Sequence, residues 1–488
     1  MTPDLPSKGD PPLPAALPPP GERLRIDTAS PSWGDVHPSL RKAMPYITRR
    51  TFLQQTTAAM ALSALSPWEP LLRAPNRPNL LYIMSDDLGY GDLGITGRTD
   101  YATPVLDALA REGVRLTQAY CAAPVCTPTR VALNTGRYPA RTRAGLFEPL
   151  TTTNDGLLPD PPTLARLIRD AGYETGLIGK WHLGLLPQFH PLRHGYDEFY
   201  GFLGAAADYA SHIDTETHQS NFQDGDTPVT TKGYLTDLFT DRAIRFIQRP
   251  RTKPFFLNLE YNAPHWPWQA PGDPAYPDSV ESRSGGSKEV FGRMVRSMDD
   301  GIGRILAALR QSGHERDTLV IFASDNGGER FSNMGPFSHG KLTLYEGGLR
   351  TPAFARWPGV ITPNTTTDQV AITLDWTATL LARAGAQADS RAPLDGIDLL
   401  PAMTGAKPAA RDLYWRISQR VKQKAMRSGD WKYLVTADGE YLFDLASDPG
   451  EKSDVKDRHA DVLATLRGKY AGWEREMLPP VPLDAASH

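Results

Sequence analysis

The chain contains 488 residues, and its 53 Lys and Arg against 56 Asp and Glu give a formal net charge of −3. This near-neutral balance argues against a nucleic-acid-binding protein, which usually carries a basic excess. The apolar share of 40% is too high for a disordered chain, and no apolar run approaches the about 20 residues of a membrane-spanning helix. The two cysteines, Cys121 and Cys126, exclude a disulfide framework and leave at most one short bridge. These limits favour a soluble, multi-element α/β enzyme.

The N-terminal part of the chain is predicted to precede the folded enzyme. Residues 1–43 are rich in proline, and we expect a disordered extension that could be a gene-start artefact, since Met44 is a plausible start. Residues 44–70 place Arg49-Arg50 ahead of a short apolar run, as a twin-arginine export signal does. A solvated arginine pair on a surface helix is the alternative. We therefore expect an exported, periplasmic protein.

From residue 75 onward, short apolar runs alternate with helical patterns. Buried strands are predicted at 80–84, 177–178, 255–259 and 319–323. A helix is predicted from Thr103, as the cap residue, and Pro104, as its first residue, to Gly113. Further helices are predicted over 163–171 and over the helically spaced apolar residues between Val290 and Leu309. This alternation indicates an α/β fold over residues 75–405, with a large mostly parallel mixed sheet sandwiched by helices.

The C-terminal residues 406–488 have a different pattern. Short strands are predicted at 412–416, 431–435 and 441–445, followed by a helix from about residue 460 to 475. Successive strands followed by a helix indicate a smaller α+β subdomain with a short antiparallel sheet.

Polar clusters directly follow the predicted strands of the larger unit. They are Ser85-Asp86-Asp87, Gly179-Lys180-Trp181-His182, Asn262-Ala263-Pro264-His265 and Ser324-Asp325-Asn326. Because ligands of open α/β sheets bind beyond the carboxyl ends of the strands, we expect the four clusters to converge at one edge. The first and last clusters offer only oxygen ligands, which suit Ca²⁺ or Mg²⁺ rather than zinc. We therefore predict a metal site formed by Asp86, Asp87, Asp325 and Asn326, the alternative being ordinary caps and turns.

Cationic side chains are expected at the same edge. They are Lys180, His182, His265 and Lys341. Cations beside a divalent metal favour a tetrahedral oxyanion, phosphate or sulfate, because they neutralise its oxygens during transfer. For any one of them alone, the alternative is a surface charge or a hydrogen-bonded core histidine.

A helix is predicted to begin at the start of the segment from Cys126 to Arg137. Pro128 fits a first helical turn and Gly136 fits a stop, so Cys126 would lie where free N–H groups favour an anion and activate a thiol. The alternatives are an inert buried cysteine and a bridge from Cys121 to Cys126.

The segment also resembles a family signature. Cys-x-Pro-x-Arg followed by x-x-Leu-x-Thr-Gly-Arg is similar to the signature of the type I sulfatases, which belong to the alkaline-phosphatase-like superfamily. Further similar segments follow in family order from about Pro78 to Asp457, with arylsulfatases as the nearest type. They are Ser85–Asp92, Gly179–Gly184, Pro264-His265, Ser324–Gly328, Gly340–Pro352, and Phe443–Leu445 with Asp448–Glu451.

The resemblance implies a covalent mechanism. Cys126 would be converted to Cα-formylglycine by a formylglycine-generating enzyme, and it would lie beside a metal, Ca²⁺ by resemblance with Mg²⁺ also open. A hydroxyl of the hydrated aldehyde would attack sulfur, and Asp325 would accept its proton. His265 and Lys341 would support the leaving oxygen, and His182 would help expel sulfate. Lys180 and Arg130 would hold the aldehyde oxygens. The substrate-binding residues would be Lys180, His265, Lys341 and, from a weaker match, His212.

The implied activity is release of sulfate from an aryl or carbohydrate sulfate ester, with a sulfated small molecule or glycan as substrate. Two alternatives stay open: a formylglycine-dependent phosphonate or phosphodiester hydrolase, and an exported inactive protein that binds glycans or oxyanions. Thr129 stands where the family most often has Ser, and we expect the maturing enzyme to accept it. Trp266 and Trp268 could line a subsite for a ring or could simply be packed.

Overall fold

The structure is a computed structural model that describes residues 77–150, 154–276, 283–419 and 421–480. The predicted proline-rich extension and export signal, residues 1–43 and 44–70, lie outside the described residues. None of the helices in the described ranges is both long and apolar enough to span a membrane.

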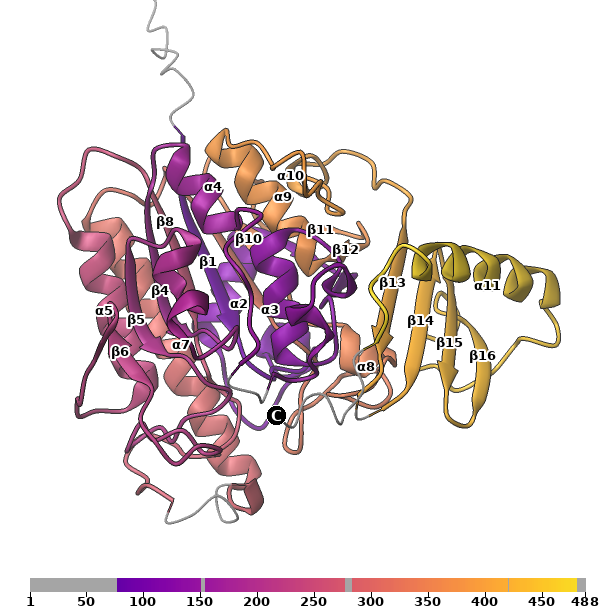
Figure 1. The fold of residues 1–488 in the computed structure, drawn as a ribbon, viewed down its shortest axis with the longest axis horizontal. Coiled ribbons are helices and arrows are strands. Elements are labelled where there is room, and N and C mark those ends of the chain that lie inside the picture. Colours follow the sequence, from indigo (N-terminus) through magenta and orange to yellow (C-terminus); the bar gives the residue numbers. More distant parts are fainter. Residues whose placement is uncertain (1–76, 151–153, 277–282, 420, 481–488) are drawn as a thin grey trace, which may run out of the picture. The chain divides into compact units, whose positions relative to one another are not determined.

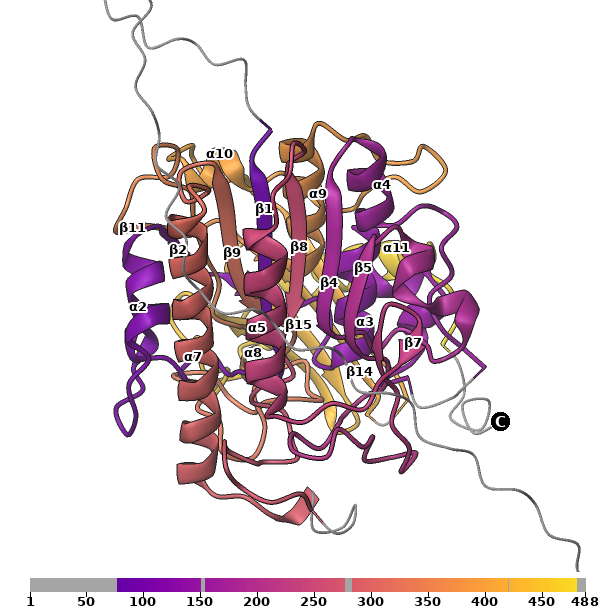
Figure 2. The ribbon, with the colours of Figure 1, turned by 90° about the vertical axis from the view of Figure 1, so that its left-hand side faces the viewer.

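A ten-stranded mixed sheet forms the centre of the larger part, in the order β11-β2-β10-β9-β1-β8-β4-β5-β6-β7 (Figures 1 and 2). The five strands from β9 to β5 are mutually parallel, whereas β10, β6 and β7 pair antiparallel with their neighbours. The bounds are β1 Asn79–Ser85, β2 Val114–Leu116, β4 Glu174–Lys180, β5 Glu198–Phe202, β6 Phe222–Asp224, β7 Thr227–Pro228, β8 Phe255–Glu260, β9 Thr318–Ser324, β10 Phe354–Arg356 and β11 Thr365–Thr367. All four predicted buried strands are confirmed as β1, β4, β8 and β9.

Helices cover both faces of this sheet (Figure 2). Leu81 and Ile83 of β1 pack with one set of helices, and Leu80, Tyr82 and Met84 pack with the other. The first set is α2 Pro104–Arg111, α5 Leu235–Gln248 and α7 Lys288–Gln311; the second is α3 Cys126–Thr135, α4 Leu164–Asp170 and α9 Thr373–Ala384. Burial on both faces explains why β1 is an unbroken apolar run rather than an alternating one.

Shorter elements connect these layers. They are α8 Glu346–Leu349, α10 Leu400–Met403, the paired strands β3 Ala119–Tyr120 and β12 Ala371–Ile372, and 3-10 turns at Gly94–Thr96, Pro139–Arg141, Ala144–Leu146, Pro187–Phe189 and Pro191–His194.

One predicted detail of α2 is wrong. The helix begins at Pro104 as expected, but the side chain of Thr103 does not cap it. Instead, the carboxylate of Asp299 on α7 accepts hydrogen bonds from the N–H groups of Val105 and Leu106, at 3.1 and 2.7 Å. Asp299, which is distant in the sequence, therefore accepts the hydrogen bonds at the N-terminus of α2 that Thr103 was expected to accept.

The smaller C-terminal part is an antiparallel four-stranded sheet, β13-β14-β15-β16, followed by α11 (Figure 1). The bounds are β13 Asp412–Ile417, β14 Gln423–Ser428, β15 Trp431–Thr436, β16 Gly439–Asp444 and α11 Ala460–Glu474. The predicted fold class is thus confirmed. β14 was not predicted, because polar residues flank its two buried apolar residues, Ala425 and Met426, and the apolar run is too short to indicate a strand.

A buried ionic network joins the C-terminal sheet to α8. Lys432 Nζ on β15 lies 2.9 Å from Glu346 Oε1, and Arg350 Nε lies 2.7 Å from Glu346 Oε2. The hydroxyl of Tyr120 donates to the same oxygen at 2.7 Å, and Glu451 lies 2.8 Å from Lys432. Part of the segment 340–352, which was recognised by its family resemblance, therefore connects the C-terminal sheet to α8 and to Tyr120 of β3.

Candidate active site

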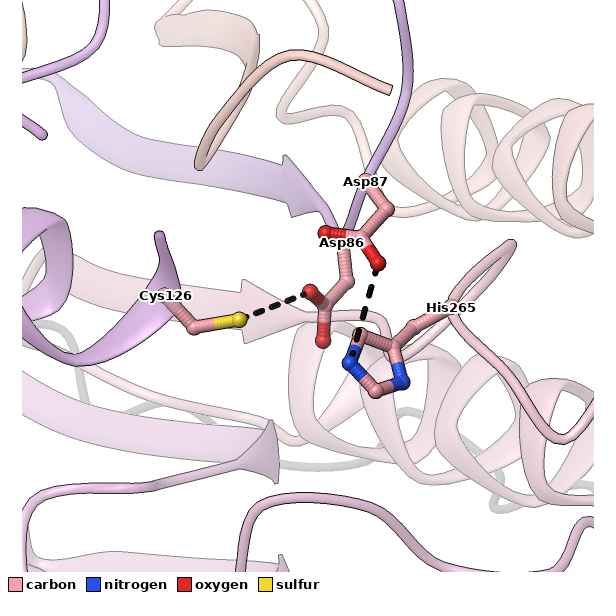
Figure 3. Close-up of side chains that lie close together, drawn as sticks. All are labelled: Asp86, Asp87, Cys126 and His265. Carbon is pink, nitrogen blue, oxygen red and sulfur yellow. Dashed lines mark hydrogen bonds and ion pairs between the residues drawn. The ribbon is translucent and has the colours of Figure 1, made fainter. Parts of the chain in front are cut away.

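The carboxyl ends of four adjacent strands supply the candidate site. Asp86 and Asp87 follow β1, Lys180 ends β4, and Asp325 follows β9. His265 lies in the loop after β8. The structure brings these residues together, as the parallel sheet requires. Figure 3 shows Cys126 and His265 on opposite sides of the Asp86-Asp87 pair.

Asp86 lies at the centre of a buried ion-pair cluster. Its Oδ2 lies 2.5 Å from Lys180 Nζ and 3.4 Å from Arg130 Nη2, and all three side chains are almost fully buried. Arg130 also reaches Asp325 Oδ2 at 3.0 Å and Glu260 Oε2 at 2.9 Å. Burial alone would raise the pKa of Asp86, yet Lys180 and its fellow cations hold that pKa well below its usual range.

Asp87 is held by a second group of contacts. Its backbone is in the left-handed region, with φ 63°, and its N–H donates to Asp325 Oδ1 at 3.1 Å. Its Oδ1 accepts from Asn326 Nδ2 at 2.7 Å, and its Oδ2 lies 2.7 Å from Lys341 Nζ. Aspartate adopts this conformation more readily than most residues, and these contacts hold it in place.

Asp325 has the opposite electrostatics to Asp86. Burial and the negative charge of Asp86 raise the pKa of Asp325 to about 7, even though Arg130 is in contact. Because the carboxyl groups of Asp86 and Asp325 are buried close together, ionisation of both is unfavourable without additional positive charge.

Four side chains that could ligate a metal lie close together at this site. One ligand atom from each of Asp86, Asp87, Cys126 and His265 lies within 4.8 Å of the others, and all four residues are buried. Asn326 Oδ1 is buried and has no hydrogen-bond partner among the described residues. A buried oxygen without a partner, next to two carboxylates, could act as a ligand to an oxygen-bound cation.

Cys126 is the first residue of α3, as predicted, and its Sγ lies 3.5 Å from Asp86 Oδ1. The predicted activation of the thiol is wrong, because burial and the charge of Asp86 raise its pKa well above the usual value. Both cysteines are free, so the bridge alternative is not realised. Thr129 Oγ1 donates to the carbonyl of Ala123 at 2.9 Å and accepts from its N–H at 3.1 Å, contacts that a serine hydroxyl could also make.

The two histidines are held in defined tautomers. His182 Nε2 lies 3.1 Å from the carbonyl oxygen of Leu150, so Nε2 carries the proton and Nδ1 is left as an acceptor. His265 Nδ1 lies 2.5 Å from the carbonyl oxygen of Trp266, which places its lone pair at Nε2, 3.6 Å from Asp87 Oδ2. Burial lowers the pKa of both rings, to about 3 for His265, where Lys341 adds to the effect.

A cavity of about 200 Å³, here called the catalytic cavity, opens onto this cluster. Cys126, His182, His265 and Lys341 line it together with Trp266, Trp268, Glu216, Arg283 and Glu329. Both tryptophans reach the cavity, and Trp268 is also packed edge-on against Phe331, with 4.9 Å between ring centroids. Burial alone would lower the pKa of Lys341, but Asp87 and nearby negative groups raise it well above its usual value.

The sequence reading missed Glu260 and Glu329. Glu260 is the last residue of β8 and pairs with Arg130, so the strand-end rule could have found it. Glu329 lies 3.4 Å from Lys341 Nζ, and only the fold reveals that contact.

The structure does not bring His212 to the cluster. Its Nε2 lies 2.7 Å from the carbonyl oxygen of Gly233, and its ring stacks on Phe222 at 5.3 Å. The substrate-side role of His212 stays a prediction that these contacts do not support.

Comparison with known proteins agrees with this geometry. The Sulfatase family model matches residues 78–386, and the model for the C-terminal part of N-sulphoglucosamine sulphohydrolase matches residues 337–474. The chain is 35% identical to an N-acetylgalactosamine-6-sulfatase of Sus scrofa over 73% of each chain. It is 32% identical to a steryl-sulfatase of Mus musculus, over 87% of this chain and 86% of the relative.

Solved structures include the same fold. The crystal structure of Ps i-CgsB superposes with a TM-score of 0.77 at 31% identity, covering 83% of this chain and 94% of that one. The doubly covered sheet, the clustered strand-end residues and these matches define a sulfuric-ester hydrolase. The chain belongs to the sulfatase family, which confirms the resemblance recognised in the sequence.

Proposed function

We propose that this enzyme hydrolyses sulfate esters by means of a Cα-formylglycine made from Cys126 and a divalent cation, preferentially Ca²⁺. The observation that carries the proposal is the position of Cys126. Its sulfur lies beside Asp86, in a cavity that His182, His265 and Lys341 also line. A reactive group at this position would face hard metal ligands on one side and cations on the other.

The residues that would hold the cation are Asp86, Asp87, Asp325 and Asn326, with residue 126 beside them. The cation would lower the pKa of a bound hydroxyl and orient the sulfate, and the hydrated aldehyde would supply the nucleophilic hydroxyl. Ca²⁺ accepts six to eight oxygen ligands in flexible geometry, which suits this all-oxygen set.

The protonation state of each basic residue determines which role it can have in the reaction. Lys180 and Arg130 stay charged because they pair with Asp86, and they would hold the oxygens of residue 126. His182 is neutral with Nδ1 unpartnered among the described residues, so it can accept a proton there. Lys341 stays protonated and His265 is neutral, so Lys341 is the better candidate to support the leaving oxygen.

We further propose a sulfated small molecule or glycan as substrate. N-acetylgalactosamine-6-sulfatase and steryl-sulfatase are named among the relatives, and Ps i-CgsB has been crystallised in complex with k-i-k-neocarrahexaose. The division into a catalytic domain, 75–405, and a C-terminal subdomain, 406–488, also stays our proposal.

Export by the twin-arginine pathway is likewise a proposal, and it rests on Arg49 and Arg50. Replacing both by Lys should keep the protein out of the periplasmic fraction, while the same replacement at Arg141 should not.

Peptide mass and activity together test the main proposal. We expect the tryptic peptide 116–130, from protein coexpressed with a formylglycine-generating enzyme, to lose the thiol of Cys126 and gain an aldehyde oxygen. The same protein should hydrolyse 4-nitrophenyl sulfate, and Cys126→Ala should abolish this. Cys121→Ala changes the other cysteine of the same peptide and should preserve turnover. Activity in Cys126→Ala, or in protein whose Cys126 is still a thiol, would refute the proposal. Faster turnover of phenylphosphonate than of the sulfate would favour the phosphonate-hydrolase alternative.

A further inference from the structure

Two more cavities adjoin the catalytic cavity in a row. A middle cavity of about 120 Å³ shares His182, Ala205 and Glu216 with the catalytic cavity. A distal cavity of about 380 Å³ shares Leu185 and Leu203 with the middle one. The space around Cys126 is therefore the first of three consecutive hollows.

The three cavities follow the edge of the sheet at which the parallel strands β4 and β5 end. Leu185 lies just beyond β4, Leu203 directly follows β5, and Gln223 of the distal cavity belongs to β6. Because β4, β5 and β6 are neighbours in the sheet, the hollows extend from the reactive centre past successive strands. A chain-like ligand could lie along this edge with one unit in each hollow.

The wall of the middle cavity is fixed before any ligand binds. Asp214 is buried, and its Oδ1 accepts from the N–H groups of Glu216 and Thr217 at 3.0 and 2.8 Å. Asn221 Nδ2 donates to the other carboxylate oxygen at 3.0 Å. Such a preformed wall reduces the ordering cost of binding an extended ligand.

The distal cavity is half polar and half apolar. Its polar lining residues are His190, Arg193, Gln223 and Asp226, and its apolar ones are Leu185, Pro187, Leu192 and Leu203. The ring of His190 is fixed, since its Nε2 lies 2.8 Å from Gln223 Oε1 and its Nδ1 accepts from the N–H of Leu192 at 3.3 Å. A sterol or aryl group would require mostly apolar walls, whereas a sugar ring presents both hydroxyls and C–H faces.

Arg193 gives this cavity a cation without a counter-ion. It is exposed, and no carboxylate in the described ranges lies within ion-pair distance of its guanidinium. Asp226 lines the same cavity and can accept hydrogen bonds from hydroxyl groups. A guanidinium can bind a sulfate or carboxylate with two parallel hydrogen bonds, so Arg193 is suited to an anionic substituent.

We propose that the substrate is a sulfated oligosaccharide that lies along the three cavities, with its scissile sulfate at residue 126 and a second anionic substituent on Arg193. This inference rests on the proposed sulfatase function and assigns Arg193 as a specificity-determining residue. The sugar unit between the two anions would occupy the middle cavity.

Matched substrates test the inference. The probes are 4-nitrophenyl sulfate, N-acetylgalactosamine 6-sulfate, and hexasaccharides prepared from chondroitin 6-sulfate and from carrageenan. We expect at least one hexasaccharide to show a higher kcat/KM than the monosaccharide. Arg193→Ala should lower that kcat/KM about tenfold, as expected for loss of a charged hydrogen bond at an exposed position, and should leave the two small substrates unchanged.

Two controls sharpen the comparison. Arg296→Ala removes another exposed arginine, on α7, and should change no substrate. A hexasaccharide that carries only the scissile anion should be insensitive to Arg193→Ala. The inference is overturned if the hexasaccharides neither react faster than the monosaccharide nor compete more strongly with 4-nitrophenyl sulfate, or if Arg193→Ala affects all substrates equally. Failure of the sulfatase proposal itself would look different, because 4-nitrophenyl sulfate would then not be hydrolysed at all.

Discussion

Replacing Lys432 by Met should destabilise the protein strongly, although the residue is far from the catalytic cavity in sequence. Lys432 is fully buried on β15 and contacts Glu346 at 2.9 Å and Glu451 at 2.8 Å. Methionine fills a similar volume but carries no charge. Glu346 would then keep Arg350 as its cationic partner and lose Lys432.

The magnitude follows from the electrostatics of Glu346. Burial alone would raise the pKa of this carboxyl, but Lys432 and Arg350 lower it from 4.5 to about 2. A net shift of that size, which is the balance of burial against both cations, corresponds to about 3 kcal/mol. Removing one partner of a buried ion pair typically costs about 3–5 kcal/mol, so we expect a loss of about 3 kcal/mol for Lys432→Met.

Urea unfolding at pH 7, followed by tryptophan fluorescence, measures this loss. The matched control is Lys424→Met on the neighbouring strand β14, where the half-exposed lysine pairs with Glu474 at 2.7 Å. Exposed pairs contribute about 0–1 kcal/mol, so the control should unfold almost like the parent. A loss below 1 kcal/mol for Lys432→Met, or equal losses for the two variants, would refute the reasoning.

Two further predictions concern metal and pH. Chelation by EDTA should abolish turnover and lower the melting temperature, and excess Ca²⁺ should restore both. The reason is that a cation that binds only the folded state stabilises that state. A melting temperature that responds to neither EDTA nor Ca²⁺ in calorimetry would contradict the proposed metal site. Burial raises the pKa of Glu148 to about 7, despite hydrogen bonds from the N–H groups of Ser418 and Gln419. Its contribution to stability is therefore fully present below pH 4.5 and is lost as the pH rises through 7. The free energy of unfolding, measured by urea titration, should fall less between pH 5 and pH 8 for Glu148→Gln than for the parent, by up to about 3 kcal/mol. Equal pH dependences for the two proteins would contradict this prediction.

The sequence predicted the parts of the site that depend on strand ends. Asp86 and Asp325 meet because β1 and β9 are parallel neighbours in register, and Ser85 pairs directly with Ser324. A short apolar run followed by acidic residues already contains that information. The same rule would have identified Glu260, had it been applied to every charged residue that closes a strand.

Other features depend on tertiary contacts that no local pattern contains. Asp299 reaches α2 from a helix almost two hundred positions away, so Thr103 looked like the natural cap. The thiol of Cys126 looked activated because a helix N-terminus favours an anion, but burial beside Asp86 outweighs that effect. The Nε2 of His212 lies 2.7 Å from the carbonyl oxygen of Gly233, a contact that no motif in the sequence indicates.

The protonated thiol of Cys126 has a consequence for how this enzyme is quantified. A buried thiol with a raised pKa is a poor nucleophile at neutral pH, so under the proposed mechanism unconverted molecules fold normally and contribute no turnover. A partly converted preparation is then a mixture of active and inactive molecules. The apparent kcat per mole of protein scales with the converted fraction, while KM stays constant, so active-site titration must precede any comparison between variants.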